Sequence, residues 1–222
     1  MSNSNLISYT KISPNKNSPR NHKIDTITIH CVVGQWTAKQ IADYFASASV
    51  GASPNYGVGC DGKIALCVEE KDRSWCSSNK DNDHRAITIE VASDTKHPYT
   101  VNSKAYNALI DLLVDICKRN GIKQLLWKGD KALIGKVDKQ NMTVHRWFKN
   151  KACPGDYLYN KHGEIANEVN KRLAPKLTKH EQAVECACKI EDKTGLSKDT
   201  IKWLWSYKYA DDLFIKLWEA MN

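Results

Sequence analysis

Two histidines and one cysteine are the residues of this chain whose types and spacing point most directly to chemistry. His30 ends the segment TITIH, His145 lies in TVHRWF, and Cys153 follows eight residues later in KNKACPG. Two imidazoles and a thiolate make a three-ligand zinc site with a fourth position open for water. Nitrogen and sulfur ligands favour zinc over magnesium or calcium. Because the chain has seven histidines and eight cysteines, a chance spacing of structural or surface residues is the alternative.

The strands and helices expected around these residues indicate an α/β domain, built on a mixed central β-sheet flanked by helices. Alternation of apolar and β-branched residues predicts strands, and amphipathic spacing after a capping residue predicts helices. The expected strands are residues 24–30, a hairpin over 56–68 that turns at Asp61-Gly62, a central strand over 86–93, and MTVH at 142–145. The expected helices follow Thr37 (with Ile41, Phe45 and Ala48 on one face) and Asn102, and cover residues 164–173, after an irregular lead-in over 1–23.

A domain boundary is expected near Pro175, which divides the chain into residues 1–174 and a small all-α module over 175–222. Three short helices are predicted in this module, at 179–192, 198–207 and 211–221. Its expected core comprises Ile201, Leu204, Trp205, Leu213, Leu217 and Trp218. Trp203, Trp205 and Trp218 have two interpretations, either as core residues or as a surface that stacks on sugar rings.

The net charge of +8 lies entirely in the first 174 residues, because eight lysines and eight acidic residues balance one another from Pro175 onward. A basic domain suits a polyanionic partner such as nucleic acid or a Gram-positive wall with teichoic acids. Neither an arginine-rich helix nor aromatic residues interleaved with basic ones are present, so nucleic acid is not the expected partner.

Export and membrane signals are missing from the sequence. No apolar run approaches the roughly 20 residues that span a bilayer, and the polar N-terminus lacks the apolar core of a secretory signal. We therefore expect synthesis in a reducing cytoplasm, where most of the cysteines act as small buried hydrophobic residues.

Four segments resemble, in order, the motifs of the type 2 amidases, the family of phage lysozyme-like amidases and peptidoglycan recognition proteins. They are TITIHCV, SPNYGVGCDGKI, RAITIEVASD and TVHRWFKNKACPGD, and the resemblance covers residues 24–173. It implies a mixed sheet flanked by helices, with zinc held in a groove by His30, His145 and Cys153. The implied reaction is hydrolysis of the amide that joins the lactyl group of N-acetylmuramic acid to L-alanine in bacterial peptidoglycan.

The resemblance adds two catalytic residues. Glu90 matches a glutamate used by amidases of Gram-positive phages and prophages, and Lys151 matches a lysine that faces the scissile carbonyl. A carboxylate can take the proton of water and deliver it to the leaving amine, and an ammonium group can stabilise the oxyanion. The alternatives are a surface carboxylate at a strand end and a solvated loop lysine.

The chain departs from the family pattern at two places. Pro54 stands where many members have a catalytic tyrosine, so Tyr56 is expected in the core or lining the groove. Trp75-Cys76-Ser77 lacks the histidine that many members carry there, which puts local substrate contacts in doubt. Cys153 is retained, whereas recognition proteins that bind without cutting usually lack it, and this favours an enzyme.

These observations together predict a phage or prophage endolysin that accumulates in the host cytoplasm and reaches the wall after a holin opens the membrane. A host autolysin of the same chemistry and a non-catalytic peptidoglycan-binding protein are the alternatives. The C-terminal module is expected to bind the wall, with homodimerisation through its helices as the second interpretation.

Overall fold

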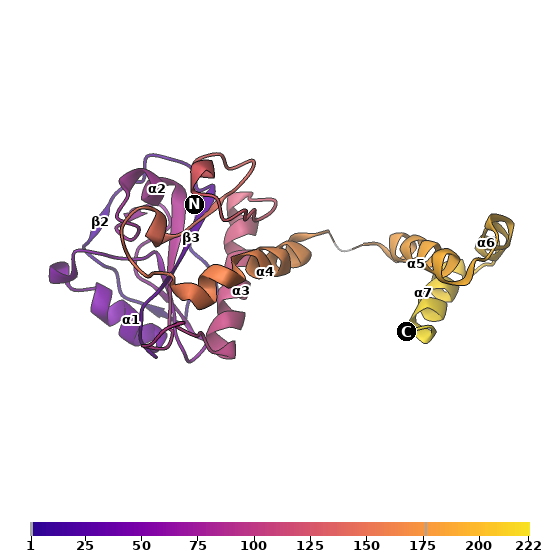
Figure 1. The fold of residues 1–222 in the computed structure, drawn as a ribbon, viewed down its shortest axis with the longest axis horizontal. Coiled ribbons are helices and arrows are strands. Elements are labelled where there is room, and N and C mark those ends of the chain that lie inside the picture. The colour runs from indigo at the N-terminus through magenta and orange to yellow at the C-terminus, as the bar shows by residue number, and fades with distance from the viewer. Residues whose placement is uncertain (1, 176) are drawn as a thin grey trace. The chain divides into compact units, whose positions relative to one another are not determined.

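The computed structural model describes residues 2–175 and 177–222. The chain divides into two compact units, Met1–Leu173 and Ala174–Asn222. Figure 1 draws both units as a ribbon. Buried apolar clusters lie within each of them. Among the described residues, none of the helices combines the length and the apolar character that a membrane span requires.

The larger unit is built on a mixed sheet, as the sequence predicted, and this sheet has six strands. Its strand order is β1 (Tyr9–Thr10), β5 (Ile64–Leu66), β4 (Tyr56–Val58), β7 (Ala86–Val91), β3 (Thr26–Cys31) and β8 (Met142–Thr143). The strands β4, β7, β3 and β8 run parallel to one another. Strand β5 is antiparallel to β4. A separate antiparallel pair comprises β2 (Lys16–Asn17) and β6 (Arg73–Ser74).

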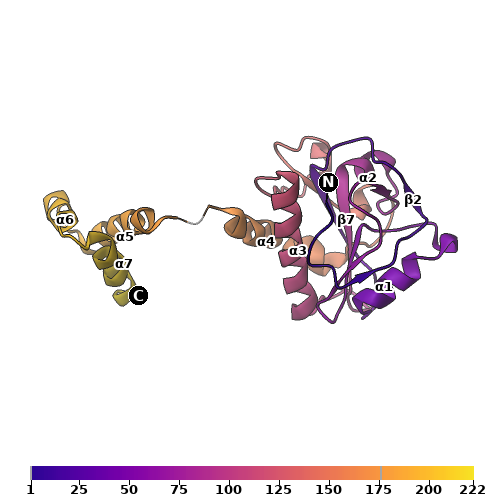
Figure 2. The ribbon, with the colours of Figure 1, turned by 180° about the vertical axis from the view of Figure 1, so that it is seen from behind.

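Helices cover both faces of this sheet. Figures 1 and 2 show α1 (Ala38–Phe45) on one side and α3 (Ser103–Asn120) with α4 (Gly155–Leu173) on the other. The largest apolar cluster joins alternate residues of β3 and β7 to the buried faces of α3 and α4. On the opposite face, Gly57 allows α1 to pack closely on β4, because a Cβ there would lie 2.5 Å from Cγ2 of Ile41.

The alternation along β3 separates an apolar face from a polar one. Ile27 and Ile29 join the apolar cluster, whereas Thr28 lies in a buried hydrogen-bond network. Its Oγ1 is 2.7 Å from Oγ1 of Thr143 and accepts a hydrogen bond from Asn82 of α2 (Lys80–Arg85) at 3.0 Å. Because His30 is two residues beyond Thr28, it belongs to the polar face.

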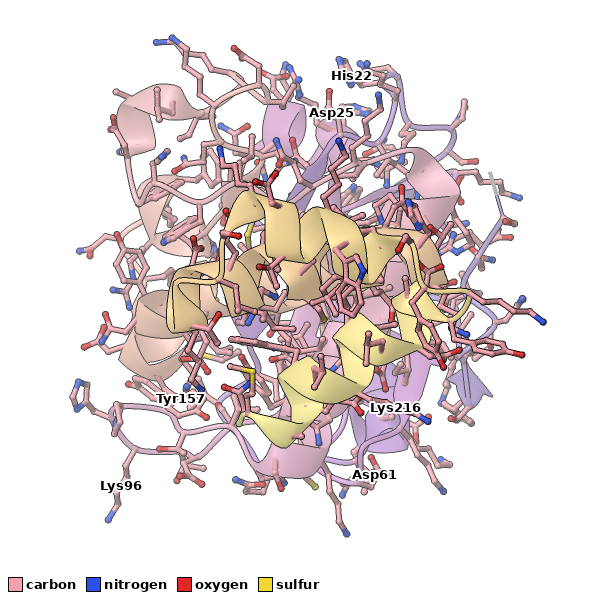
Figure 3. The ribbon with its side chains drawn as sticks, turned by 90° about the vertical axis from the view of Figure 1, so that its right-hand side faces the viewer. His22, Asp25, Asp61, Lys96, Tyr157 and Lys216 are labelled. Carbon is pink, nitrogen blue, oxygen red and sulfur yellow. The ribbon has the colours of Figure 1, made fainter. Side chains whose placement is uncertain are left out.

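An ion pair joins the segments that lead into the two central strands. Arg85, just before β7, donates from Nε and Nη2 to the two carboxylate oxygens of Asp25, just before β3, at 3.0 and 2.7 Å. Asp25 lies beside His22 at this end of the unit (Figure 3). In the parallel register of β3 and β7, His30 is the partner of Glu90.

Three local expectations for this unit were wrong. Residues 1–23 contain β1 and β2, whose pairing partners lie more than fifty residues away and are invisible to local patterns. Helix α4 begins at Gly155 and not at 164, because Leu158 and His162 of its polar first half are buried. Ala48 belongs to the 3-10 turn η1 (Ala48–Val50) and is exposed, since α1 ends at Phe45.

The smaller unit consists of α5 (Lys179–Thr194), α6 (Lys198–Trp205) and α7 (Ala210–Ala220). Thr178 caps α5 with a capping box, and Gly195 ends it in the left-handed conformation. The core residues are Ala183, Ala187, Ile190, Ile201, Ala210 and Phe214. Phe214 takes the central place, whereas Leu217, which the sequence placed in the core, is 38% exposed.

The three tryptophans of this unit have different surroundings. Trp205 and Trp218 pack against the core, and the Trp205 ring lies 4.4 Å from that of Phe214. Trp203 is 71% exposed. The core interpretation therefore holds for two of them, and the third is left on the surface.

Candidate metal centre and active site

The structure brings His30, His145 and Cys153 together at the carboxyl ends of β3 and β8. His30 lies in β3, His145 begins the 3-10 turn η3 (His145–Trp147) after β8, and Cys153 lies in the loop before α4. One nitrogen or sulfur atom from each residue lies within 4.8 Å of the others. Sγ of Cys153 is 3.3 Å from Nδ1 of His30, and the two imidazole centroids are 5.1 Å apart.

The loop that carries Cys153 is held by backbone contacts. The N–H of Arg146 donates to the carbonyl of Cys153 at 3.1 Å, and the N–H of Gly155 donates to Ala152 at 2.8 Å. Gly155 has φ +81°, and a Cβ there would lie 2.8 Å from Cβ of Tyr99. Since a side chain at 155 would be both strained and obstructed, glycine is required for the turn that directs Cys153 toward His30.

The surroundings of both histidines favour neutral imidazoles. Burial, together with the charges of His145 and His162, lowers the pKa of His30 well below its usual value. Burial and the nearby charge of Lys151 lower the pKa of His145. A neutral imidazole is the form that binds a metal ion.

The donor set fits a metal ion. Nδ1 of His30 lies 3.3 Å from Sγ of Cys153, so these two atoms are close enough to bind one ion. Burial raises the pKa of the Cys153 thiol, and a thiolate at this place therefore needs a cation beside it. Two nitrogen atoms and one sulfur atom are the ligands of an open zinc site.

Glu90 lies next to this cluster. It is the register partner of His30 on β7, and its carboxylate lies within 4.8 Å of ligand atoms of His30 and Cys76. Sγ of Cys76 is 3.8 Å from Oε1, whereas the enclosed Oε2 has no hydrogen-bond partner among the described residues. Burial raises the pKa of Glu90 to about 8. A poorly solvated carboxylate of this kind is suited to accept and return a proton.

Lys151 lies on the exposed rim of the site. With His145 it lines a groove of about 490 Å³, which also includes Trp75, Ser78 and Lys80. Its ammonium group faces solvent at the groove and is close enough to His145 to affect the pKa of that imidazole. Tyr56, by contrast, is fully buried and donates its hydroxyl to Glu70 at 2.6 Å, so it is a core residue.

One segment contacts the site although the motifs assigned no site residue to it. Residues 76–78 follow β6, and they touch Glu90 through Cys76 and His145 through Ser78. The available signal was the run of small polar residues in WCSSN before α2, because Asn79 caps that helix. The capping role explains why an asparagine stands at position 79. It does not indicate that the Ser78 side chain points toward His145.

Residues 20–156 match the family model described as N-acetylmuramoyl-L-alanine amidase. This is more than half of the chain, and the protein therefore belongs to that family of hydrolases. It is a type 2 amidase, as its motifs predicted. No curated protein matches the sequence.

Solved structures show the same fold. PlyL is 16% identical with a TM-score of 0.55, and the match covers 72% of this chain and 95% of that one. A mutant endolysin from Bacillus subtilis is 18% identical with a TM-score of 0.55, covering 74% and 99%. The endolysin LysCS, an N-acetylmuramoyl-L-alanine amidase from Clostridium intestinale, is 17% identical with a TM-score of 0.50, covering 77% and 99%.

Proposed function

We propose that this protein is a zinc-dependent amidase that cuts peptidoglycan between N-acetylmuramic acid and L-alanine. The observation that carries the proposal is the convergence of His30, His145 and Cys153 beside Glu90 in a chain of the amidase family. Zinc held by the first three side chains would supply Lewis acidity and make hydroxide available from water near neutral pH.

The remaining residues of the site have distinct roles in this proposal. Glu90 takes the proton of the attacking water and returns it to the nitrogen of L-alanine as the amide bond breaks. Its enclosed Oε2 has no competing hydrogen bond among the described residues. Lys151, on the rim of the groove, donates to the carbonyl oxygen as negative charge develops there.

Mass analysis of purified Gram-positive peptidoglycan after digestion tests this proposal. The expected products are free stem peptides with new N-terminal alanine and glycan strands that remain uncut. A zinc chelator should abolish their release, and added zinc should restore it. New reducing ends, or cuts within the peptides, would refute the proposed bond. Wall binding without any release would favour the non-catalytic alternative.

The biological setting that we propose is phage or prophage lysis, with the enzyme stored in the host cytoplasm until a holin opens the membrane. Support comes from the fold shared with proteins named as endolysins and from the arrangement of an amidase unit followed by a small helical unit. The test is expression in a Gram-positive host. Cells should stay intact until the membrane is permeabilised, whereas lysis without permeabilisation would favour a host autolysin.

For the smaller unit we propose binding to the cell wall. Trp203 is 71% exposed and, with Tyr207 and Leu213, lines an apolar hollow. Aromatic rings of this kind stack on the apolar faces of sugars. Truncation after Leu173 should preserve cleavage of soluble muropeptides and weaken lysis of whole cells.

A point substitution separates sugar stacking from the loss of the whole unit. Trp203→Ala should reduce pull-down on purified walls, whereas Tyr44→Ala, which removes an aromatic ring that is 49% exposed on α1, should not. Unchanged binding by Trp203→Ala would count against the sugar surface. Homodimerisation through these helices is the alternative role, and sedimentation of the full chain as a dimer would support it.

A further inference from the structure

Ser78 contacts one of the three candidate metal ligands from outside the cluster. Its Oγ is 3.0 Å from Nε2 of His145. The hydroxyl comes from the loop between β6 and α2, whereas His145 comes from the turn after β8, so the contact joins segments 67 residues apart in the sequence. The hydrogen bond made by one imidazole nitrogen determines whether the other nitrogen is free to bind a metal ion.

A buried carboxylate holds the loop that carries Ser78 through hydrogen bonds. Asp83, which is 2% exposed, accepts hydrogen bonds from the backbone N–H of Cys76 at 3.0 Å and from that of Ser77 at 3.2 Å. The Ser77 hydroxyl also donates to Asp83 at 2.6 Å. Asn79, the next residue after Ser78, caps α2. Ser78 is therefore fixed on both sides.

The backbone of Ser78 is strained in this position. Its φ is +60°, in the left-handed region that favours glycine. A non-glycine residue in such a conformation is disfavoured and persists where the surroundings over-determine it, most often at functional sites. Glycine would avoid this strain, and the one group that serine adds is the hydroxyl directed at His145.

We infer that Ser78 is a positioning residue that holds His145 as the Nε2–H tautomer and leaves Nδ1 as its metal-binding atom. In a neutral imidazole one nitrogen donates and the other accepts, so a hydroxyl that accepts from Nε2–H reserves the lone pair of Nδ1. The metal-binding part of this inference rests on the proposed zinc function. The tautomer and the ring orientation are properties of the chain alone.

Ser78→Gly is the variant that tests this inference. Glycine adopts φ +60° without strain, so the metal-free variant should fold at least as stably as the unmodified protein. Ser49→Gly is the matched control, because Ser49 is an exposed serine of η1 whose hydroxyl hydrogen-bonds Ser47. Zinc affinity is measured by competition against a chromogenic chelator. We expect binding about 10–100-fold weaker for Ser78→Gly and no change for Ser49→Gly.

Nitrogen NMR of the metal-free proteins gives a second readout that does not depend on zinc. The unmodified protein should show His145 protonated at Nε2, and Ser78→Gly should show a mixture of tautomers. Protonation at Nδ1 in the unmodified protein, or unchanged zinc affinity in Ser78→Gly, would overturn the inference. If the unmodified protein took up no zinc, the proposed function would fail, and the tautomer measurement would still decide the role of Ser78.

Discussion

Replacing Glu90 by glutamine should separate activity from stability. Glutamine keeps the shape of the side chain and removes its ability to exchange a proton. A general base or acid is worth about 10²–10⁴ in rate, which at about 1.4 kcal/mol per decade is about 3–5 kcal/mol of transition-state stabilisation. We expect Glu90→Gln to lose about that factor in kcat and to retain zinc binding, because Glu90 is not one of the three proposed ligands.

The same substitution should stabilise the metal-free protein at alkaline pH. Burial raises the pKa of Glu90 from its ordinary value of 4.5 to about 8 in the folded protein. A raised folded-state pKa means that stability is fully present below pH 4.5 and is lost as the pH rises through about 8. At about 1.4 kcal/mol per pKa unit, the loss has an upper limit of roughly 5 kcal/mol.

Thermal unfolding of both proteins in the presence of a chelator measures this difference. At pH 5 the melting temperatures should be similar, because the folded protein holds Glu90 largely protonated. At pH 9 Glu90→Gln should melt higher, by about 2–4 °C for each kcal/mol in a domain of this size. Equal melting temperatures at pH 9 would refute the argument that the carboxylate is buried without compensation. Full wall hydrolysis by the variant would refute the catalytic role.

Three further predictions concern the metal, the oxyanion and the scaffold. Cys153→Ser should leave a folded protein with no bound zinc by elemental analysis and no lytic activity; an active variant would refute the ligand assignment. Lys151→Met should lower kcat by about 10–100-fold with little change in KM, and an effect on KM alone would indicate substrate binding. Arg20, which is itself buried, donates to five backbone carbonyls, so Arg20→Met should cost about 3–5 kcal/mol in urea unfolding; a loss below 1 kcal/mol would contradict this.

The helices with clear caps were predictable because their signals are local. Asn102 caps α3 and Gly121 ends it in the left-handed conformation, as the sequence indicated. The hairpin of β4 and β5 forms around Gly62, which has φ +75°. In each case a few adjacent residues determine the backbone geometry, and no distant contact is needed.

The short elements were not predictable in the same way. The two residues of β1 become a strand because they pair with β5, and this pairing depends on residues more than fifty positions away. In the smaller unit, the spacing of apolar residues predicted the helices. It did not predict which apolar residue would lie at the centre of the core. Phe214 is buried and Leu217 is exposed because the packing of three helices decides which side of each faces inward.

For the candidate site, the sequence by itself determined the chemistry: two imidazoles and a thiol at fixed spacing, with a glutamate in an apolar strand. Tertiary structure alone decided the geometry. The parallel register of β3 and β7 sets Glu90 against His30, and the fold of the loop before α2 brings Ser78 to His145. Residue types and the local spacing of apolar residues can be recognised in the sequence. Strand register and loop packing arise from contacts between distant segments, which only the folded chain can form.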